Sequence, residues 1–131
     1  MKPVVSIGLP VRNGEKYLKR SLLSIINQTE QNIEIIVSDN NSTDKTQLIL
    51  KEFKKKDNRI KVFRQKKPLV VIDNFKFVLS KAKAKYFMWA AHDDTRSLNY
   101  IEVVLKNLKS SNDSILAFSD MFEIPVDKYK D

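Results

Sequence analysis

The stretch IEIIVSDNNSTDKT, residues 33–46, carries a short apolar run directly into a dense group of polar residues. Ile33 to Val37 is rich in β-branched side chains, which predicts a buried strand. Ser38 to Asp44 contains only residue types that favour turns and helix caps. Apolar residues then recur at helical spacing, at Leu48, Ile49 and Phe53. The stretch therefore predicts a strand, a polar turn and a helix.

The same alternation extends along the chain on both sides of this stretch. Further strands are predicted at Val4–Leu9, closed by Pro10, at Ile60–Phe63, at Tyr86–Ala90 and, as one long strand or two short ones, at Ile115–Ile124. Helices are predicted from the apolar spacing that reaches about Gln28, from Ile72 to Ala82 and from Tyr100 to Lys109. Asn13 is placed to cap the first helix.

Strands that alternate with helices predict an α/β fold, a mostly parallel sheet with helices on both faces. We expect residues 1–131 to form one domain of this kind. Tyr86–Ala90 is apolar throughout, as strands covered on both faces are. Ligands bind such sheets at the carboxyl ends of the strands. Polar clusters directly follow three of the predicted strands and would meet at one edge: Pro10–Gly14, Ser38–Asp44 and His92–Asp94.

The composition limits which functions are open. The chain has no cysteine and one histidine, which excludes disulfides and thiolate metal sites and leaves oxygen ligands for hard cations such as Mg²⁺, Mn²⁺ or Ca²⁺. No run approaches the roughly 20 apolar residues of a membrane-spanning helix. The first residues lack a signal-peptide core and cleavage site, so we expect a cytoplasmic protein.

The net charge of +8 is concentrated between Lys45 and Lys85, where the acids are only Glu52, Asp57 and Asp73. One interpretation is a solvated helix face with its loops. The other is attraction to an anion, whether nucleic acid, a diphosphate ligand or the acidic inner face of a membrane. Charge alone does not choose among them.

The adjacent carboxylates Asp93 and Asp94 are candidates for a Mg²⁺ or Mn²⁺ site, because these ions are held by one or two carboxylates plus water and phosphate oxygens. The alternative is that both residues cap the helix before Tyr100 and bind nothing. His92 is more readily explained as an ordinary hydrogen-bonding residue than as a catalytic base. With only two glycines, Gly8 and Gly14, the chain can form neither a P-loop nor a Rossmann dinucleotide motif.

The residues after the second strand have their own candidate roles. Asp39 could accept a hydrogen bond from a nucleobase ring N–H. Asn40 and Asn41 would let the backbone turn sharply, since Asn tolerates a left-handed conformation. Ser42 to Asp44 are explained by capping of the following helix.

Three segments taken together resemble the N-terminal half of family 2 glycosyltransferases: VSIGLPVRNGEKYLKRSLLSIINQT, IEIIVSDNNSTDKT and NF..VLSKAKAKYFMWAAHDD. The likeness covers residues 3 to about 109. It implies a Rossmann-like GT-A nucleotide-binding domain, and a sequence that stops before the acceptor-binding part. It also implies transfer of a sugar, with inversion, from a nucleotide-sugar donor to a glycan or lipid-linked acceptor. A UDP-sugar is the donor that the resemblance favours.

The resemblance places donor contacts at Pro10, Val11, Arg12, Asn13, Glu15, Asp39, Asn40, Asn74 and His92, and the metal at Asp93 and Asp94. Asp39 corresponds to the acid that reads uracil. Two positions depart from the family pattern: Arg12 replaces an aromatic residue, and Ala91 replaces the first aspartate of the metal-binding Asp-x-Asp motif. The family's general base lies downstream of this chain and is not assigned.

Three function hypotheses follow. The first is a metal-dependent glycosyltransferase in polysaccharide biosynthesis, cytoplasmic or peripheral at the inner membrane face, with homo-oligomers left open. The second is a nucleotide-sugar-binding module without turnover. The third, a basic polyanion-binding protein, ranks lowest because the basic region has no nucleic-acid motif, and we expect no nucleic-acid partner.

Overall fold

The computed structural model describes residues 2–110 and 116–117, and it forms one parallel sheet with helices on both faces. The elements are β1 (Val5–Val11), α1 (Leu18–Ile26), β2 (Ile33–Asp39), α2 (Thr46–Lys56), β3 (Ile60–Arg64), α3 (Val71–Ser80), β4 (Tyr86–Trp89) and α4 (Tyr100–Lys109). The strands lie in the order β3-β2-β1-β4, and every pair is parallel. The α/β prediction is confirmed. The strand predicted at Ile115–Ile124 lies outside the described residues, apart from 116–117.

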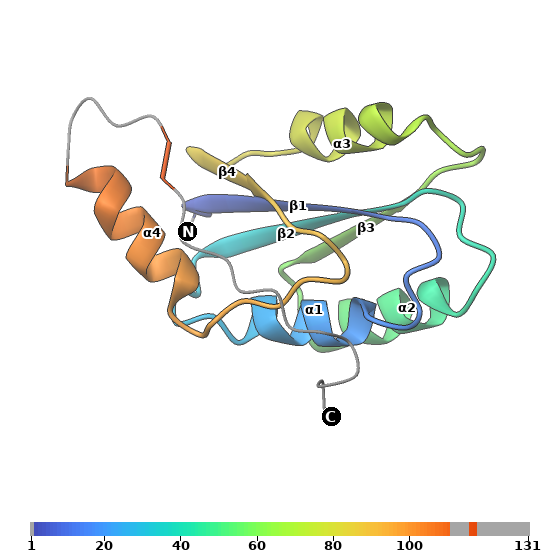
Figure 1. Ribbon diagram of the computed structural model, residues 1–131, viewed down its shortest axis with the longest axis horizontal. Helices are drawn as coiled ribbons and strands as arrows, with labels where there is room; N and C mark the ends of the chain where they lie inside the picture. The colour runs from blue at the N-terminus through green and yellow to red at the C-terminus, as the bar shows by residue number, and fades with distance from the viewer. Residues whose placement is uncertain (1, 111–115, 118–131) are drawn as a thin grey trace.

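The two faces of the sheet are covered differently (Figure 1): α1 and α2 lie on one face and α3 on the other. Alternate residues of β1 and β2, among them Ile7, Leu9, Ile35 and Val37, join the main core with residues of α1, α2 and α4. On the opposite face α3 comes very close to β1 at Gly8. A Cβ there would lie 2.7 Å from both Val78 Cγ2 and Phe87 Cζ, so only glycine fits.

The strand β1 runs two residues further than the sequence predicts, because Pro10 lies inside it. Gly8 is the last residue of β1 that pairs with β4, opposite Trp89, whereas pairing with β2 continues to Val11 and Asp39. Proline lacks a backbone donor. Pro10 therefore lies beyond the end of the β4 pairing and does not interrupt the ladder with β2.

The expectation that Tyr86–Ala90 is covered on both faces is wrong for the described structure. Tyr86, Phe87 and Met88 are half-buried, and Trp89 is 47% exposed. The physical reason is position: among the described strands β4 pairs only with β1 and forms the edge of the sheet. Ala90, one residue past the strand, is buried in the main core.

The last described helix, α4, begins and ends at the predicted residues. Ile101 and Leu105 are its buried residues and belong to the main core. None of the helices in the described part of the chain is long and apolar enough to cross a membrane.

Candidate functional site

The first two polar clusters lie side by side at the carboxyl edge of the sheet and are bonded to each other. The Asn13 backbone N–H donates to Ser42 Oγ at 2.9 Å, and Asn13 Oδ1 accepts from the Thr43 N–H at 2.9 Å. The Gly14 N–H donates to Thr46 Oγ1 at 2.8 Å, and Thr46 is fully buried. The β1–α1 and β2–α2 loops are therefore one hydrogen-bonded unit.

Asn13 does not cap α1, so that prediction is wrong. The residue before the helix is Tyr17, which makes no side-chain capping bond. Asn13 has a φ of 52°, in the left-handed region that Asn tolerates better than most residues. This conformation turns its side chain toward the β2–α2 loop, where it bonds Thr43 instead.

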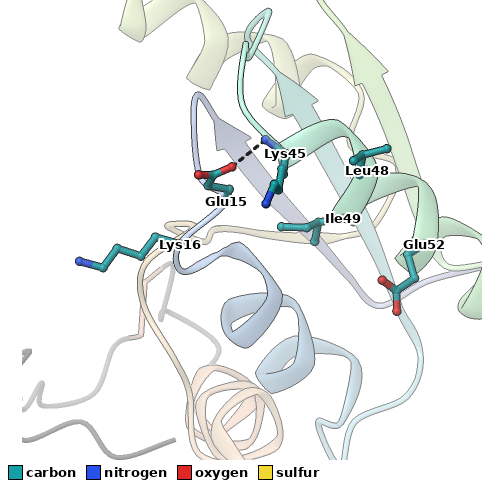
Figure 2. A pocket seen from close by; sticks show the side chains of 6 residues that line it. All are labelled: Glu15, Lys16, Lys45, Leu48, Ile49 and Glu52. Carbon is teal, nitrogen blue, oxygen red and sulfur yellow. Dashed lines mark hydrogen bonds between the residues drawn. The ribbon is translucent and has the colours of Figure 1, made fainter.

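Glu15 extends the same contact to the start of α2. Glu15 Oε2 accepts from the Lys45 N–H at 2.9 Å, and the Glu15 N–H donates to Asp44 Oδ2 at 3.0 Å. Figure 2 shows Glu15 reaching across to Lys45 beside an open hollow of about 490 Å³. The hollow is lined by Glu15, Lys16, Lys45, Leu48, Ile49 and Glu52. Glu15 is exposed here and fixed by the neighbouring loop.

The third cluster reaches the first through His92. A Cβ added to Gly14 would lie 2.9 Å from His92 Cδ2 and 2.6 Å from Val11 Cγ2, so the half-buried imidazole packs directly on this glycine. The segment after β4 thus lies against the β1–α1 loop. The predicted convergence of the three clusters at one edge is confirmed by these contacts.

Asp39 ends β2 in the centre of this edge, and its carboxylate is fully enclosed. Oδ1 accepts from the Ser42 N–H at 2.9 Å, and Oδ2 accepts from Arg64 Nη1 at 2.7 Å. The Asp39 side chain is 1% exposed, whereas that of Arg64 is 37% exposed. Arg64 lies opposite Asp39 in the β2–β3 register. Asp39 therefore meets a ligand only if Arg64 moves.

Asn40 and Asn74 are buried and hold α3 and its preceding loop to the end of β2. The Asn40 amide donates to Leu69 O at 3.0 Å and accepts from the Leu69 N–H at 2.6 Å. Asn74 Oδ1 accepts from Ser38 Oγ at 2.6 Å. The sharp turn falls on Asn41, with a φ of 55°, and not on Asn40. Both buried amides therefore support the carboxyl edge of the sheet from inside the protein.

Capping does not explain Ser42 and Thr43, which bond the β1–α1 loop as described above. The residue before α2 is Lys45, which makes no side-chain cap. Asp44 is different, because its Oδ1 accepts from the Thr46 N–H at 3.0 Å. Burial raises the pKa of Asp44, but hydrogen bonds from Thr46 and the Glu15 backbone outweigh it and hold the pKa below its usual range.

Asp93 and Asp94 are exposed, and neither caps α4, since Asn99 precedes that helix. Within residues 2–110 and 116–117 no three acidic or histidine side chains cluster closely enough to form a metal site of their own. Two adjacent exposed carboxylates still fit Mg²⁺ or Mn²⁺ arriving with a nucleotide, because such ions take their remaining ligands from phosphates and water. The donor set therefore suits a substrate-borne cation and not a preformed protein cage.

Arg96 is a half-buried cation close to this acid pair. Burial lowers the pKa of its guanidinium, while Asp94 and Tyr100 oppose the shift. The guanidinium lies 5.9 Å from the centre of the Tyr100 ring. Its Nη1 atom has no hydrogen-bond partner in the described part of the chain.

The predicted donor contacts fall into two groups. Arg12, Asn13 and Glu15 are exposed and His92 is half-buried, whereas five others are buried: Pro10, Val11, Asp39, Asn40 and Asn74. The sequence reasoning missed Arg64 and Thr46. Arg64 is recognised only from the parallel register of the structure, which sets it against Asp39, and the buried hydroxyl of Thr46 carries no sequence signal of its own.

Many of the basic side chains either pair with acids or lie on exposed surface. Lys56, Arg59, Lys61 and Arg64 pair with Glu52, Asp57, Glu34 and Asp39. The lysines of α2 lie on its exposed side. A solvated surface with local ion pairs accounts for this arrangement.

Comparison with known proteins identifies the family. The pattern that describes "Glycosyl transferase family 2" matches residues 6–130. The chain belongs to glycosyl transferase family 2. An uncharacterised glycosyltransferase of Haemophilus influenzae is 39% identical over 96% of this family 2 chain, which covers 39% of that relative. Glycosyltransferase GlyG of Streptococcus pneumoniae is 31% identical over 88% of the chain, which covers 38% of it. The chain thus spans about two fifths of these relatives.

Solved structures agree on the GT-A fold of this family 2 chain. S. aureus TarS 1-349 in complex with UDP superposes with a TM-score of 0.74 at 24% identity, over 84% of this chain and 32% of that one. A mannosyltransferase from Pyrobaculum calidifontis, in complex with GDP-Man and Mn²⁺, gives 0.73 at 16% identity, over 81% and 32%. These likenesses establish the GT-A fold. The ligands belong to those proteins.

Proposed function

We propose that the carboxyl edge of this sheet binds a nucleoside diphosphate sugar, with uridine as the preferred base, and that the protein transfers the sugar with inversion to a glycan or lipid-linked acceptor. The observation that carries the proposal is the clamp between Asn13, Ser42 and Thr43, extended to His92 through Gly14. It gathers exposed polar side chains from three loops at the place where parallel sheets bind ligands. The UDP and UDP-GlcNAc complexes of TarS support the choice of donor.

The exposed residues Arg12, Asn13 and Glu15 are proposed to face the base and ribose. Arg12 would add a positive charge where the family has an aromatic ring. Asp39 would accept a hydrogen bond from a ring N–H after the Arg64 side chain leaves Oδ2, a movement that its 37% exposure permits. Asn40 and Asn74 would act indirectly, since their amides bond Leu69 and Ser38.

Asp93 and Asp94 are proposed to hold Mg²⁺ or Mn²⁺ together with the donor diphosphate. When bound, the ion supplies Lewis-acid stabilisation of the charge on the departing diphosphate. The Mn²⁺ complex of the Pyrobaculum calidifontis mannosyltransferase supports this choice. Within the described residues the carboxylates bind and orient, and none is assigned as the general base.

The proposed setting is polysaccharide biosynthesis in the cytoplasm. The exposed lysines of this chain, whose net charge is +8, would allow contact with the acidic inner face of a membrane. Sedimentation with vesicles that contain or lack anionic lipid would check this part separately.

Calorimetric titration tests the binding proposal. UDP, GDP and uridine are titrated into the protein with and without Mn²⁺. We expect UDP to bind more tightly than GDP, and Mn²⁺ to strengthen UDP binding but not uridine binding. Absence of binding by all three, on protein shown to be folded by circular dichroism, would overturn the proposal.

Ala91 favours a second candidate, a module that binds nucleotide sugar without turning it over. The resemblance puts the first acid of the metal motif at this position, and alanine offers no ligand. Incubation with a radiolabelled UDP-sugar distinguishes the two candidates. Release or transfer of labelled sugar supports the enzyme, whereas binding without either supports the module.

A further inference from the structure

The segment that carries Asp93 and Asp94 is held at both ends by α1 and the turn after it. At the entrance, Ser21 Oγ donates to Ala91 O at 2.8 Å. At the exit, Gln28 Nε2 donates to Ser97 O at 2.7 Å. Ser21 is 1% exposed and Gln28 is fully buried. Two buried polar side chains of one helical region therefore bracket residues 92–96.

Gln28 uses both ends of its amide in this contact. Nε2 also donates to Ser24 O at 2.9 Å, and Oε1 accepts from the Ile101 N–H at 3.0 Å. The adjacent Thr29 N–H donates to Leu98 O at 2.8 Å. Gln28 thus ties α1 to the exit of the segment and to the first turn of α4. Being buried, it acts on a ligand only through the chain that it holds.

The opposite side of the segment is fixed by packing. His92 lies against Gly14, whose N–H bonds Thr46 of the β2–α2 unit. The segment that carries Asp93 and Asp94 is therefore held at Ala91, His92 and Ser97, although both carboxylates are exposed. A short segment fixed in this way can present two adjacent carboxylates in one arrangement, which lowers the entropy lost when they bind an ion.

We propose that Gln28 and Ser21 are positioning residues for the cation and diphosphate, acting through the backbone of residues 92–96. The inference rests on the proposed function, since it assumes that Asp93 and Asp94 meet a metal-bound diphosphate. It assigns a role to two residues that touch neither nucleotide nor metal. Groups that orient metal ligands typically change metal affinity by about 10- to 100-fold when they are replaced.

The test separates the metal-dependent part of binding from the rest. Gln28→Leu removes two donors and one acceptor at similar volume, and Ser21→Ala removes one hydroxyl. Ser6→Ala is the control, because Ser6 is equally buried but bonds Glu34 away from the carboxyl edge. Calorimetry with uridine, and with UDP in the presence and absence of Mn²⁺, is combined with the electron paramagnetic resonance signal of free Mn²⁺.

We expect uridine affinity to be unchanged in all three variants. The gain in UDP affinity on adding Mn²⁺ should fall by about 10- to 100-fold in Gln28→Leu and by less in Ser21→Ala, with a matching rise in free Mn²⁺. Ser6→Ala should keep the full gain. If a variant loses both uridine binding and the Mn²⁺-dependent gain in UDP affinity, the result would indicate a general loss of structure and would count against a positioning role.

The outcomes also separate this inference from the proposed function. A wild-type protein with no Mn²⁺-dependent gain removes the metal proposal and this inference together. A wild-type gain that both variants retain overturns only the positioning role. If Gln28→Leu does not fold, Ser21→Ala decides the matter, and a full gain in that variant overturns the inference.

Discussion

The carboxylate of Asp39 and the guanidinium of Arg64 lie 2.7 Å apart at the paired ends of β2 and β3. Asp39 is enclosed and Arg64 is partly open to solvent. Removing one partner should therefore not cost the same free energy of unfolding as removing the other. A buried carboxylate that loses its cation has no access to water that could replace it, whereas a partly exposed guanidinium can be hydrated.

This asymmetry predicts unequal effects on stability. Arg64→Met should cost about 3 kcal/mol, because it leaves the buried carboxylate with only the Ser42 N–H. Asp39→Asn should cost less, about 2 kcal/mol, because the amide oxygen can still accept that bond. Urea denaturation of both single variants and the double variant measures the costs and their coupling. Equal costs with no coupling would contradict the pair as described.

Asp39→Asn should also weaken uridine binding by about 10-fold, since an amide accepts more weakly than a carboxylate from a ring N–H. Asp57→Asn is the matched control. Asp57 also pairs with an arginine, Arg59, at 2.6 Å, but at the turn between α2 and β3. Uridine titration should show the loss only in Asp39→Asn, and an equal loss in both would assign the effect to stability.

The alternation of apolar runs and polar clusters was enough to predict the succession of strands and helices along the chain and the edge where the clusters meet. Local detail was less predictable, because side chains that suit a cap also suit a contact between loops. Asn13 and Ser42 are hydrogen-bonded to each other and do not cap helices, since the parallel register of β1 and β2 brings their loops together. Burial of Asp39 likewise depends on Arg64, which is 25 residues away in sequence.

Glu34 provides a pH test at the other end of the sheet. Burial raises its pKa, but hydrogen bonds from Lys61, Ser6 and the Lys83 N–H outweigh this and lower the pKa from its ordinary value of 4.5. The unfolded chain takes up this proton near pH 4.5, and the folded chain takes it up only at lower pH. The stabilisation is therefore complete above pH 4.5 and is lost as the pH falls below it.

Glu34→Gln should lower the free energy of unfolding by about 2 kcal/mol at neutral pH, because charged hydrogen bonds are lost. The difference from wild type should narrow as the pH falls below 4.5. Urea denaturation at several pH values measures both. A difference that stays constant with pH would show that the charge of Glu34 contributes nothing.

Gly14→Ala should disturb the contact between the first and third clusters. The new methyl group would lie 2.6 Å from Val11 Cγ2 and 2.9 Å from His92 Cδ2, both too short for ordinary contact. Overpacking of this kind costs about 1–3 kcal/mol. His92 is the less buried of the two neighbours, so we expect it to move. Relative to wild type, amide hydrogen exchange in Gly14→Ala should therefore increase more in residues 91–94 than elsewhere. An equal increase throughout the chain would argue against the His92 contact.

Asp93→Asn and Asp94→Asn test the acid pair itself. Each variant should lose about 10-fold or more of the Mn²⁺-dependent gain in UDP affinity, because a neutral amide is a poorer ligand than a carboxylate for a hard cation. Asp73→Asn, at an exposed acid in the first turn of α3, is the control for a change of one charge. Uridine affinity should be the same in all three, because uridine has no phosphate through which a cation could act. If the two site variants keep the Mn²⁺ gain while the wild type shows it, the cation binds elsewhere, and the three loops would then serve the base and ribose alone.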